Sequence, residues 1–352
     1  MSLTRRYPPT SALPKLEFAQ LPTPVERCRP LGDAIGVPRL WVKRDDRTGT
    51  LYGGNKVRKL EFLLADAVEQ GYEDVWTVGA VGSHHVLATC IYARRQGLEP
   101  AALHFPQPVT EHVRDNLRAL STTRPDLTLV GNRVQIPVEV LRTKIREWLA
   151  RGPDVYYIPA GGSSPVGVLG YVNAALELAD QVEAGELPEP ETVVVAAGTC
   201  GTLAGITLGF RLAGLDSRVV GVRVVDRMIA NVPTVVRLAR KTAGRLDEIG
   251  IEDVPTITPD DLELVHDFFG EDYGVPTDEG LRAIELAEEH AGFELEPTYT
   301  GKTFAALASG ELDVADDRVL YWHTLNGVDL TDRIERADVE RDLPDEYGQF
   351  FG

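Results

Sequence analysis

Residues 192–206 read Thr-Val-Val-Val-Ala-Ala-Gly-Thr-Cys-Gly-Thr-Leu-Ala-Gly-Ile, and this stretch is the strongest indication of the fold class. Its first part, Thr192–Ala197, is an unbroken apolar run, which is typical of a buried parallel strand. A loop of small residues then leads into a predicted helix, Leu203–Ala213. Backbone N–H groups at such a strand–loop–helix junction can hold a phosphate. The alternative is a turn that is rich in glycine only for packing.

The same alternation of strand and helix extends over the rest of the chain. Short β-branched or apolar runs predict further strands at Leu40–Lys43, Val75–Val78, Ala101–His104, Leu127–Val130, Val155–Ile158, Val219–Val225 and Val319–Trp322. Helical periodicity predicts further helices at Lys56–Gln70, Val138–Arg151, Val168–Ala184 and Thr277–Ala291. The alternation predicts an α/β fold with a parallel sheet that is covered on both faces. The segment Glu340–Gly352 shows no period, and we expect a polar tail there.

Composition and charge narrow the classes of function. The chain has 352 residues, of which 43% are apolar and 26% charged, as in a soluble globular protein with a sizeable core. Its net charge of −18 opposes nucleic acid, so we expect no nucleic-acid partner. Three scattered cysteines make no disulfide framework, which favours a reducing cytoplasm. The sequence shows neither a signal peptide nor a run near the ~20 apolar residues of a membrane span.

The block Tyr52-Gly53-Gly54-Asn55-Lys56-Val57-Arg58-Lys59-Leu60-Glu61-Phe62-Leu63 is the strongest local motif. Its two glycines allow a tight bend of the backbone, and a predicted helix follows directly. A lysine in the first turn of a helix lies near the positive end of the helix dipole, which lowers its pKa and favours the free amine. A free amine can bond covalently to a carbonyl group, so Lys56 is a candidate nucleophile. The alternative is a solvated basic turn formed with Arg58 and Lys59.

Three further motifs stand near predicted strands or helices. Ser83, His84 and His85 follow the strand Val75–Val78, and their hydroxyl and backbone donors are suited to a carboxylate. Adjacent histidines point to different faces of a helix, so we expect no metal site. The other two motifs are Tyr299-Thr300-Gly301-Lys302 and His323-Thr324-Leu325-Asn326-Gly327. Each of the three, taken alone, reads as an ordinary loop.

Taken together, the motifs resemble the D-cysteine desulfhydrase and 1-aminocyclopropane-1-carboxylate deaminase family of pyridoxal-phosphate enzymes. The resemblance runs from Leu21-Pro22-Thr23-Pro24 through Lys43-Arg44-Asp45-Asp46 to Gly327, which is most of the chain. The GGNKxRKLEFL block is specific for this family, and the order of the motifs also matches. The family has the tryptophan-synthase-β fold. The resemblance therefore implies two open, twisted, mostly parallel sheets flanked by helices, with pyridoxal 5'-phosphate in the cleft between two domains.

The resemblance also implies roles for individual residues. Lys56 would bind the cofactor covalently and later move the substrate α-proton, and Ser83, Tyr299 and its partner Tyr273 would be further catalytic residues. The substrate carboxylate would lie against Ser83, His84 and His85. Residues that would contact the cofactor are Asn55, Lys56, His84, Gly198, Thr199, Cys200, Gly201, Thr202, Thr300 and Thr324. Among these, residues 198–202 would hold the phosphate, and Thr300 and Thr324 would face the pyridine nitrogen.

The two threonines bear on the type of reaction. Deaminases of this family resemble one another in having Glu after the Tyr and Leu after the His, whereas desulfhydrase-like members have Ser or Thr at both positions. A neutral hydroxyl leaves the pyridine nitrogen largely unprotonated, which makes the ring a weaker electron sink. That sink is enough for β-elimination, in which the leaving group takes the electrons. It is less suited to opening a cyclopropane ring, so Thr300 and Thr324 favour a carbon–sulfur lyase.

Two motifs depart from the family pattern. The usual Ser-Asn-His/Gln triplet is Ser83-His84-His85 in this chain, and the usual His-Thr-Gly-Gly is His323-Thr324-Leu325-Asn326. A histidine in place of an amide can carry charge near neutral pH, which would suit an acidic leaving group such as the sulfonate of cysteate. It can also simply replace a hydrogen bond. The identity of the substrate therefore stays open.

The sequence predicts a cytoplasmic, homodimeric lyase that uses pyridoxal phosphate to deaminate a small amino acid by α,β-elimination. D-cysteine is the first candidate, with pyruvate, sulfide and ammonia as products. Residues 1–56 and 155–352 would form a large cofactor-binding domain, and residues 57–154 a small inserted α/β domain. Alternatives are an L-cysteate sulfo-lyase, a 1-aminocyclopropane-1-carboxylate deaminase, a racemase or dehydratase of the same fold, and a catalytically inactive pyridoxal-phosphate-binding protein. A dinucleotide-binding oxidoreductase is disfavoured, because the loop at 198–202 lacks GxGxxG spacing.

Overall fold

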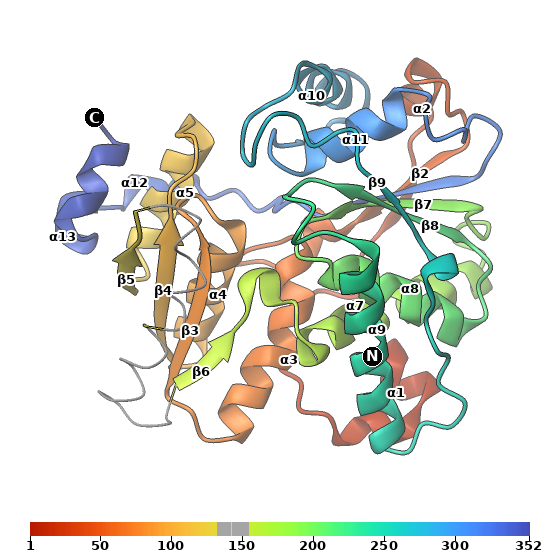
Figure 1. Cartoon of the computed structure of the whole chain (residues 1–352), viewed down its shortest axis with the longest axis horizontal. Coiled ribbons are helices and arrows are strands. Elements are labelled where there is room, and N and C mark those ends of the chain that lie inside the picture. The colour runs from red at the N-terminus through yellow and green to blue at the C-terminus, as the bar shows by residue number, and fades with distance from the viewer. Residues whose placement is uncertain (132–141, 143–154) are drawn as a thin grey trace.

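Two sheets organise the chain in a computed structural model, which describes residues 1–131, 142 and 155–352 (Figure 1). The larger sheet has six strands in the order β1-β2-β10-β7-β8-β9, and the smaller has four in the order β5-β4-β3-β6. All neighbouring strands are parallel except β1 and β2. The strands are β1 Val25–Arg27, β2 Leu40–Arg44, β3 Asp74–Ala80, β4 Glu99–Phe105, β5 Asp126–Leu129, β6 Val155–Ile158, β7 Thr192–Ala197, β8 Arg218–Arg223, β9 Glu263–Val265 and β10 Val319–His323. The predicted α/β fold with two mostly parallel sheets is confirmed.

Helices cover both faces of the larger sheet. In Figure 1, α2, α10 and α11 lie on one side of it and α7, α8 and α9 on the other. The helices are α1 Ser2–Arg6, α2 Arg29–Ala34, α3 Asn55–Glu69, α4 His84–Arg95, α5 Glu111–Ser121, α7 Pro165–Glu183, α8 Gly201–Ala213, α9 Val232–Glu248, α10 Asp278–Ala291, α11 Thr300–Ala308, α12 Thr331–Glu335 and α13 Val339–Asp342. No helix in the described part of the chain is long and apolar enough to cross a membrane.

The central strand β7 shows why its sequence is apolar without interruption. Val193 and Val195 pack into the core that α7 and α8 share. Val194, between them, packs into the core on the opposite face with Phe304 of α11. Successive side chains of a strand point to opposite faces, so a strand that is covered on both faces must be apolar at every position.

The predicted strands are all present, and each end lies within two residues of the observed one. Four predicted helices correspond to α3, α7, α8 and α10. The predicted helix Val138–Arg151 lies almost entirely outside the described residues. The prediction omitted the short strands β1 and β9, because a three-residue strand is too short to show a period. It also omitted the helices α5, α9 and α11 and several shorter helices.

The chain leaves the small sheet later than we expected, because strand β6 still belongs to that sheet. The predicted domain boundary at residue 154 assigns β6 to the larger domain, yet Val155–Ile158 pairs in parallel with β3 of the smaller sheet. We therefore propose that the chain passes from the small domain back to the large domain after Ile158. The division into a large domain and an inserted small domain stays a proposal.

The predicted polar tail at Glu340–Gly352 is wrong. Tyr347 and Phe350 are buried against the small sheet and α4, with exposed fractions of only 1% and 6%. The Tyr347 hydroxyl also lies 2.9 Å from Nδ1 of His104 in β4. Two aromatic side chains on one short turn bury enough apolar surface to hold a segment that is otherwise polar.

Candidate active site

A cavity of about 880 Å³ lies between the two sheets. Its wall contains residues of β3 and β7 as well as residues just beyond the carboxyl ends of β3, β7 and β10, which is where parallel α/β sheets bind their ligands. Every residue that the sequence nominated for the site lines this cavity: Asn55, Lys56, Ser83, His84, His85, Gly198, Thr199, Cys200, Gly201, Thr202, Tyr273, Tyr299, Thr300 and Thr324. Residues that are up to 269 positions apart in sequence (Asn55 and Thr324) therefore meet at one place.

Lys56 stands in the first turn of α3, directly after a tight bend. Gly54 makes this bend with a φ of +79°, and a Cβ at that position would lie 2.7 Å from the Thr324 carbonyl oxygen. The Lys56 amine donates to Oδ1 of Asn55 at 2.6 Å. Burial lowers the pKa of Lys56 to about 8, while the nearby Glu296 carboxylate acts to raise it. Desolvation is thus the main cause of the lowered pKa, and it leaves a substantial share of free amine near neutral pH.

The residues after Lys56 exclude a solvated basic turn. Arg58 is 1% exposed, and its guanidinium pairs with Asp45 at 2.7 Å and with Glu177 at 3.0 Å. Lys43 of β2 reaches the same Glu177 at 2.7 Å. This buried network joins β2, α3 and α7, so it fixes the first turn of α3 against the larger sheet.

The loop between β7 and α8 has the form of an anion cradle. Cys200 is the N-cap residue of α8, with a φ of +68°, and its own side chain makes no capping hydrogen bond. The Gly201 N–H donates to Oγ of Ser163 at 3.1 Å, and a Cβ on Gly201 would lie 2.5 Å from that oxygen. Glycine at 201 therefore allows Ser163 to approach the first turn of the helix. A helix N-terminus that lines a cavity and lacks a cap from its own N-cap residue fits a phosphate.

Lys59 is a cation at this cradle that the sequence analysis did not nominate. Its side chain lines the cavity, and its amine lies 3.1 Å from the position of a Cβ on Gly201. The amine donates to the Gly161 carbonyl at 3.0 Å. Burial, and then the charge of Lys56, hold the pKa of Lys59 well below its usual value. A phosphate dianion at the cradle would favour the protonated form of this amine by its opposite charge, so the cradle fits the phosphate of pyridoxal phosphate. The spacing of three residues from Lys56, which puts both on one helix face, was the available signal.

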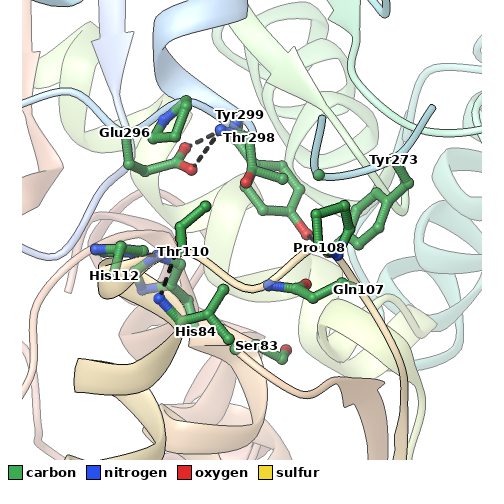
Figure 2. A pocket seen from close by; sticks show the side chains of 14 residues that line it. Ser83, His84, Gln107, Pro108, Thr110, His112, Tyr273, Glu296, Thr298 and Tyr299 are labelled. Carbon is green, nitrogen blue, oxygen red and sulfur yellow. Dashed lines mark hydrogen bonds between the residues drawn. The ribbon is translucent and has the colours of Figure 1, made fainter. Parts of the chain in front are cut away.

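Two tyrosines converge on another wall of the cavity. The hydroxyls of Tyr273 and Tyr299 hydrogen-bond to each other, and Figure 2 shows the two rings meeting. Burial and the neighbouring Tyr273 raise the pKa of Tyr299 well above its usual value, so it is a neutral phenol at physiological pH. The pair can hold or donate a proton, but it supplies no negative charge.

Glu296 positions this wall, and the sequence analysis missed it. Its Oε1 accepts from the N–H groups of Tyr299 and Thr300, both at 2.7 Å, and its Oε2 accepts from Thr298 at 2.7 Å (Figure 2). The carboxylate thus caps the N-terminus of α11 and orients the backbone of Tyr299. An acidic residue just before a helix is a recognised signal, but the sequence analysis predicted no helix at Thr300–Ala308.

The remaining predicted residues differ in how they face the cavity. The Thr300 hydroxyl accepts from the Glu296 N–H at 2.8 Å, so it is already engaged. Ser83 is the N-cap of α4 and accepts from Val86 N–H at 3.3 Å. The Thr77 hydroxyl donates to the Ile158 carbonyl, so Nε2 of His85 donates to Thr77 at 2.9 Å. His85 is thus anchored to the small sheet, whereas Ser83 and His84 also line a smaller pocket beside the cavity.

Comparisons with known proteins agree with this geometry. A family model described as "pyridoxal-phosphate dependent enzyme" matches residues 16–324. D-cysteine desulfhydrase from Salmonella typhimurium is 37% identical over 320 residues, which cover 88% of this chain and 93% of that protein.

Solved structures agree as well. An ACC deaminase homologue matches with a TM-score of 0.80 and 30% identity, over 94% of this chain and 98% of that chain. The processed form of threonine deaminase isoform 2 from Solanum lycopersicum has a TM-score of 0.62 and 17% identity, over 95% of this chain and 87% of that chain. At that identity the likeness concerns the fold alone.

Proposed function

Because the chain belongs to the family of pyridoxal-phosphate dependent enzymes, we propose that it is a carbon–sulfur lyase with D-cysteine as its first candidate substrate. Its products would be pyruvate, sulfide and ammonia. One observation carries the proposal: Lys56, whose pKa is about 8, shares a cavity with the N-terminus of α8. The name of the Salmonella typhimurium relative supports the choice of substrate.

The residues that line the cavity support a place for each part of the cofactor. Gly198, Thr199, Cys200, Gly201 and Thr202 would hold the phosphate with their backbone, and the Lys59 amine would add a further donor. Thr300 and Thr324 would lie near the pyridine nitrogen. The chemistry that pyridoxal phosphate supplies when bound is an electron sink for bonds that break at the substrate α-carbon.

The residues of the chain divide the remaining work. The Lys56 amine would hold the cofactor covalently and, when free, would take the α-proton. Ser83 and the N-terminus of α4 would bind the substrate carboxylate, because a helix N-terminus favours an anion. Tyr299, oriented by Glu296 and bonded to Tyr273, would serve as a neutral proton donor to the leaving group.

Two features of the cavity disfavour ring-opening deamination and sulfonate elimination. A ring-opening deaminase calls for a carboxylate beside the pyridine nitrogen, and both oxygens of Glu296 are bonded to backbone N–H groups instead. A sulfo-lyase would gain from a charged His84. Burial, together with His112 and Lys56, holds the pKa of His84 well below its usual value, so the ring is neutral at pH 7.

The same proposal covers the setting of the enzyme, as a cytoplasmic homodimer. Cys28, Cys90 and Cys200 are free thiols, as a reducing compartment favours. The dimer is an inference from the family alone. Light scattering on the purified protein tests it, and the mass of a single 38.5 kDa chain would contradict it.

The activity is tested by supplying the protein with pyridoxal phosphate and then with D-cysteine, L-cysteate, D-serine or 1-aminocyclopropane-1-carboxylate. We expect D-cysteine to give pyruvate and sulfide in equal amounts, faster than any other substrate is consumed. Equal or faster turnover of cysteate would assign a sulfo-lyase instead. Bound cofactor without release of keto acid from any of the four would indicate a binding protein and contradict the proposal.

A further inference from the structure

A line of hydrogen bonds leaves the cavity through three side chains from different elements. The Tyr52 hydroxyl, just before α3, lies 2.5 Å from Nδ1 of His84 at the start of α4. Nε2 of the same ring lies 2.8 Å from Nε2 of His112 in α5, and Figure 2 shows the two rings facing each other. Tyr52 and His84 line the large cavity, whereas His84 and His112 line the smaller pocket. The line therefore joins the two spaces.

The surroundings fix the direction of these bonds. A neutral imidazole has one N–H donor and one acceptor nitrogen. The side-chain nitrogen of Asn116, Nδ2, can only donate, and it lies 3.5 Å from Nε2 of His112. That nitrogen is consequently the acceptor, so Nε2–H of His84 donates to it. Nδ1 of His84 then carries no proton, so it accepts a hydrogen bond from the Tyr52 hydroxyl.

We propose that Tyr52, His84 and His112 form a proton relay between the reaction cavity and the adjoining pocket. The inference rests on the proposed function, because an elimination moves protons from the α-carbon and onto the leaving group. The relay is independent of which small amino acid is the substrate.

The outward step balances at every atom. A proton from the cavity binds to the Tyr52 oxygen, and the original hydroxyl proton moves to Nδ1 of His84. Nε2 of His84 then gives its proton to Nε2 of His112, and Nδ1 of His112 gives one to water. Each residue gains one proton and loses one, so no charge accumulates. Both rings finish in the opposite tautomer, in which the line can return a proton from water to the cavity.

The inner end of this line is buried and its outer end is partly exposed, as a proton relay between the cavity and water requires. Tyr52 is 1% exposed, so its hydroxyl exchanges protons with the solvent poorly by itself. His112 is partly exposed, in the second position of α5. A relay needs this arrangement, because the buried end serves the reaction and the outer end reaches water. The cavity also holds Lys56 and Glu296, whose charges face the inner end.

Substitution of His112 separates a relay from a packing contact. We expect His112→Ala to lower kcat about 10–100-fold with little change in KM, and added imidazole to restore it, because a small base can replace the outer member. His112→Gln keeps an acceptor for His84 but cannot pass a proton on, so it should be equally slow. His290→Ala, at an exposed helix end, is the control and should behave as wild type. Full activity of His112→Gln, or no rescue by imidazole, would overturn the relay.

A second measurement is independent of activity. In cofactor-free protein labelled with ¹⁵N-histidine, nuclear magnetic resonance reports which nitrogen of each ring carries the proton. We expect Tyr52→Phe to change the tautomer signals of both His84 and His112, since one line of bonds couples them. Unchanged signals from His112 would mean that the line is broken, and the relay would be wrong. If no substrate is turned over, this experiment still tests the relay, so the two failures are distinguishable.

Discussion

Glu296 and Lys56 face the same cavity, and the Glu296 carboxylate raises the pKa of the Lys56 amine while burial lowers it to about 8. The same carboxylate caps α11 through three backbone N–H groups. One side chain therefore sets the position of Tyr299 and the protonation of the nucleophile. A change at Glu296 should therefore affect both the stability of the cavity wall and the pKa of Lys56.

The pKa of Lys56 predicts how fast the cofactor attaches at different pH values. Only the free amine attacks, so the attachment rate should rise roughly tenfold per pH unit below the pKa and level off above about pH 8. The measurement mixes cofactor-free protein with pyridoxal phosphate and follows the visible absorbance band. A midpoint near 10.5, the usual value for lysine, would contradict the account.

Glu296→Gln should shift that midpoint below 8, because it removes the charge that raises the pKa of Lys56. It should also lower the free energy of unfolding by about 1–2 kcal/mol, since an amide has one acceptor oxygen in place of two and carries no charge at the helix N-terminus. Denaturant unfolding and the attachment profile measure both effects. Glu294→Gln, at an exposed position two residues earlier, is the matched control. An unchanged midpoint in Glu296→Gln would refute the link.

Lys59→Met should weaken binding of pyridoxal phosphate about 10–100-fold, which corresponds to the ~1.5–3 kcal/mol of a hydrogen bond to a charged group. Methionine has a similar length and suits a buried site, so the fold should persist. Fluorescence titration with the cofactor measures the affinity. Lys241→Met, on the exposed side of α9, is the control. Equal affinity of the Lys59 variant and the wild type would remove Lys59 from the phosphate site.

Arg58→Met should destabilise the protein by about 3–5 kcal/mol, because it removes the cation that pairs with buried Asp45 and leaves Glu177 paired with Lys43 alone. Burial opposes ionisation of Glu177, yet Arg58 and Lys43 hold its pKa at about 2, below the usual 4.5. Stability from a lowered carboxylate pKa is present above 4.5 and is lost as the pH falls towards 2. The difference between wild type and variant should therefore shrink over that range. Arg237→Met, at an exposed site, is the control. The prediction would be contradicted if Arg58→Met destabilised the protein no more than Arg237→Met does.

The sequence was sufficient for eight of the ten described strands and for fourteen of the residues that line the cavity. Strand β7 is apolar from Val193 to Ala197 because both of its faces are covered, and this local pattern is visible in the chain itself. Lys56 and the loop at 198–202 were found in the same way, since a glycine bend or a small-residue loop next to a helix is also a local signal.

Partners that are distant in sequence leave no such signal. His84 and His112 are 28 residues apart, and neither position predicts the other. Arg58 looked solvated because its partner Glu177 is 119 residues away. The C-terminal turn was misread for a related reason: Tyr347 and Phe350 interrupt a polar segment, and only the packed small sheet shows where they are buried.

The central claim is that Lys56 is the residue that bonds to pyridoxal phosphate. The most direct test treats the protein and cofactor with borohydride, which makes the lysine–cofactor bond permanent, and maps the modified peptide by mass spectrometry. The account predicts the added mass on Lys56 alone, and none on the peptide of a Lys56→Ala variant. The modification of Lys59 or Lys302 in place of Lys56, or of no lysine at all, would contradict it.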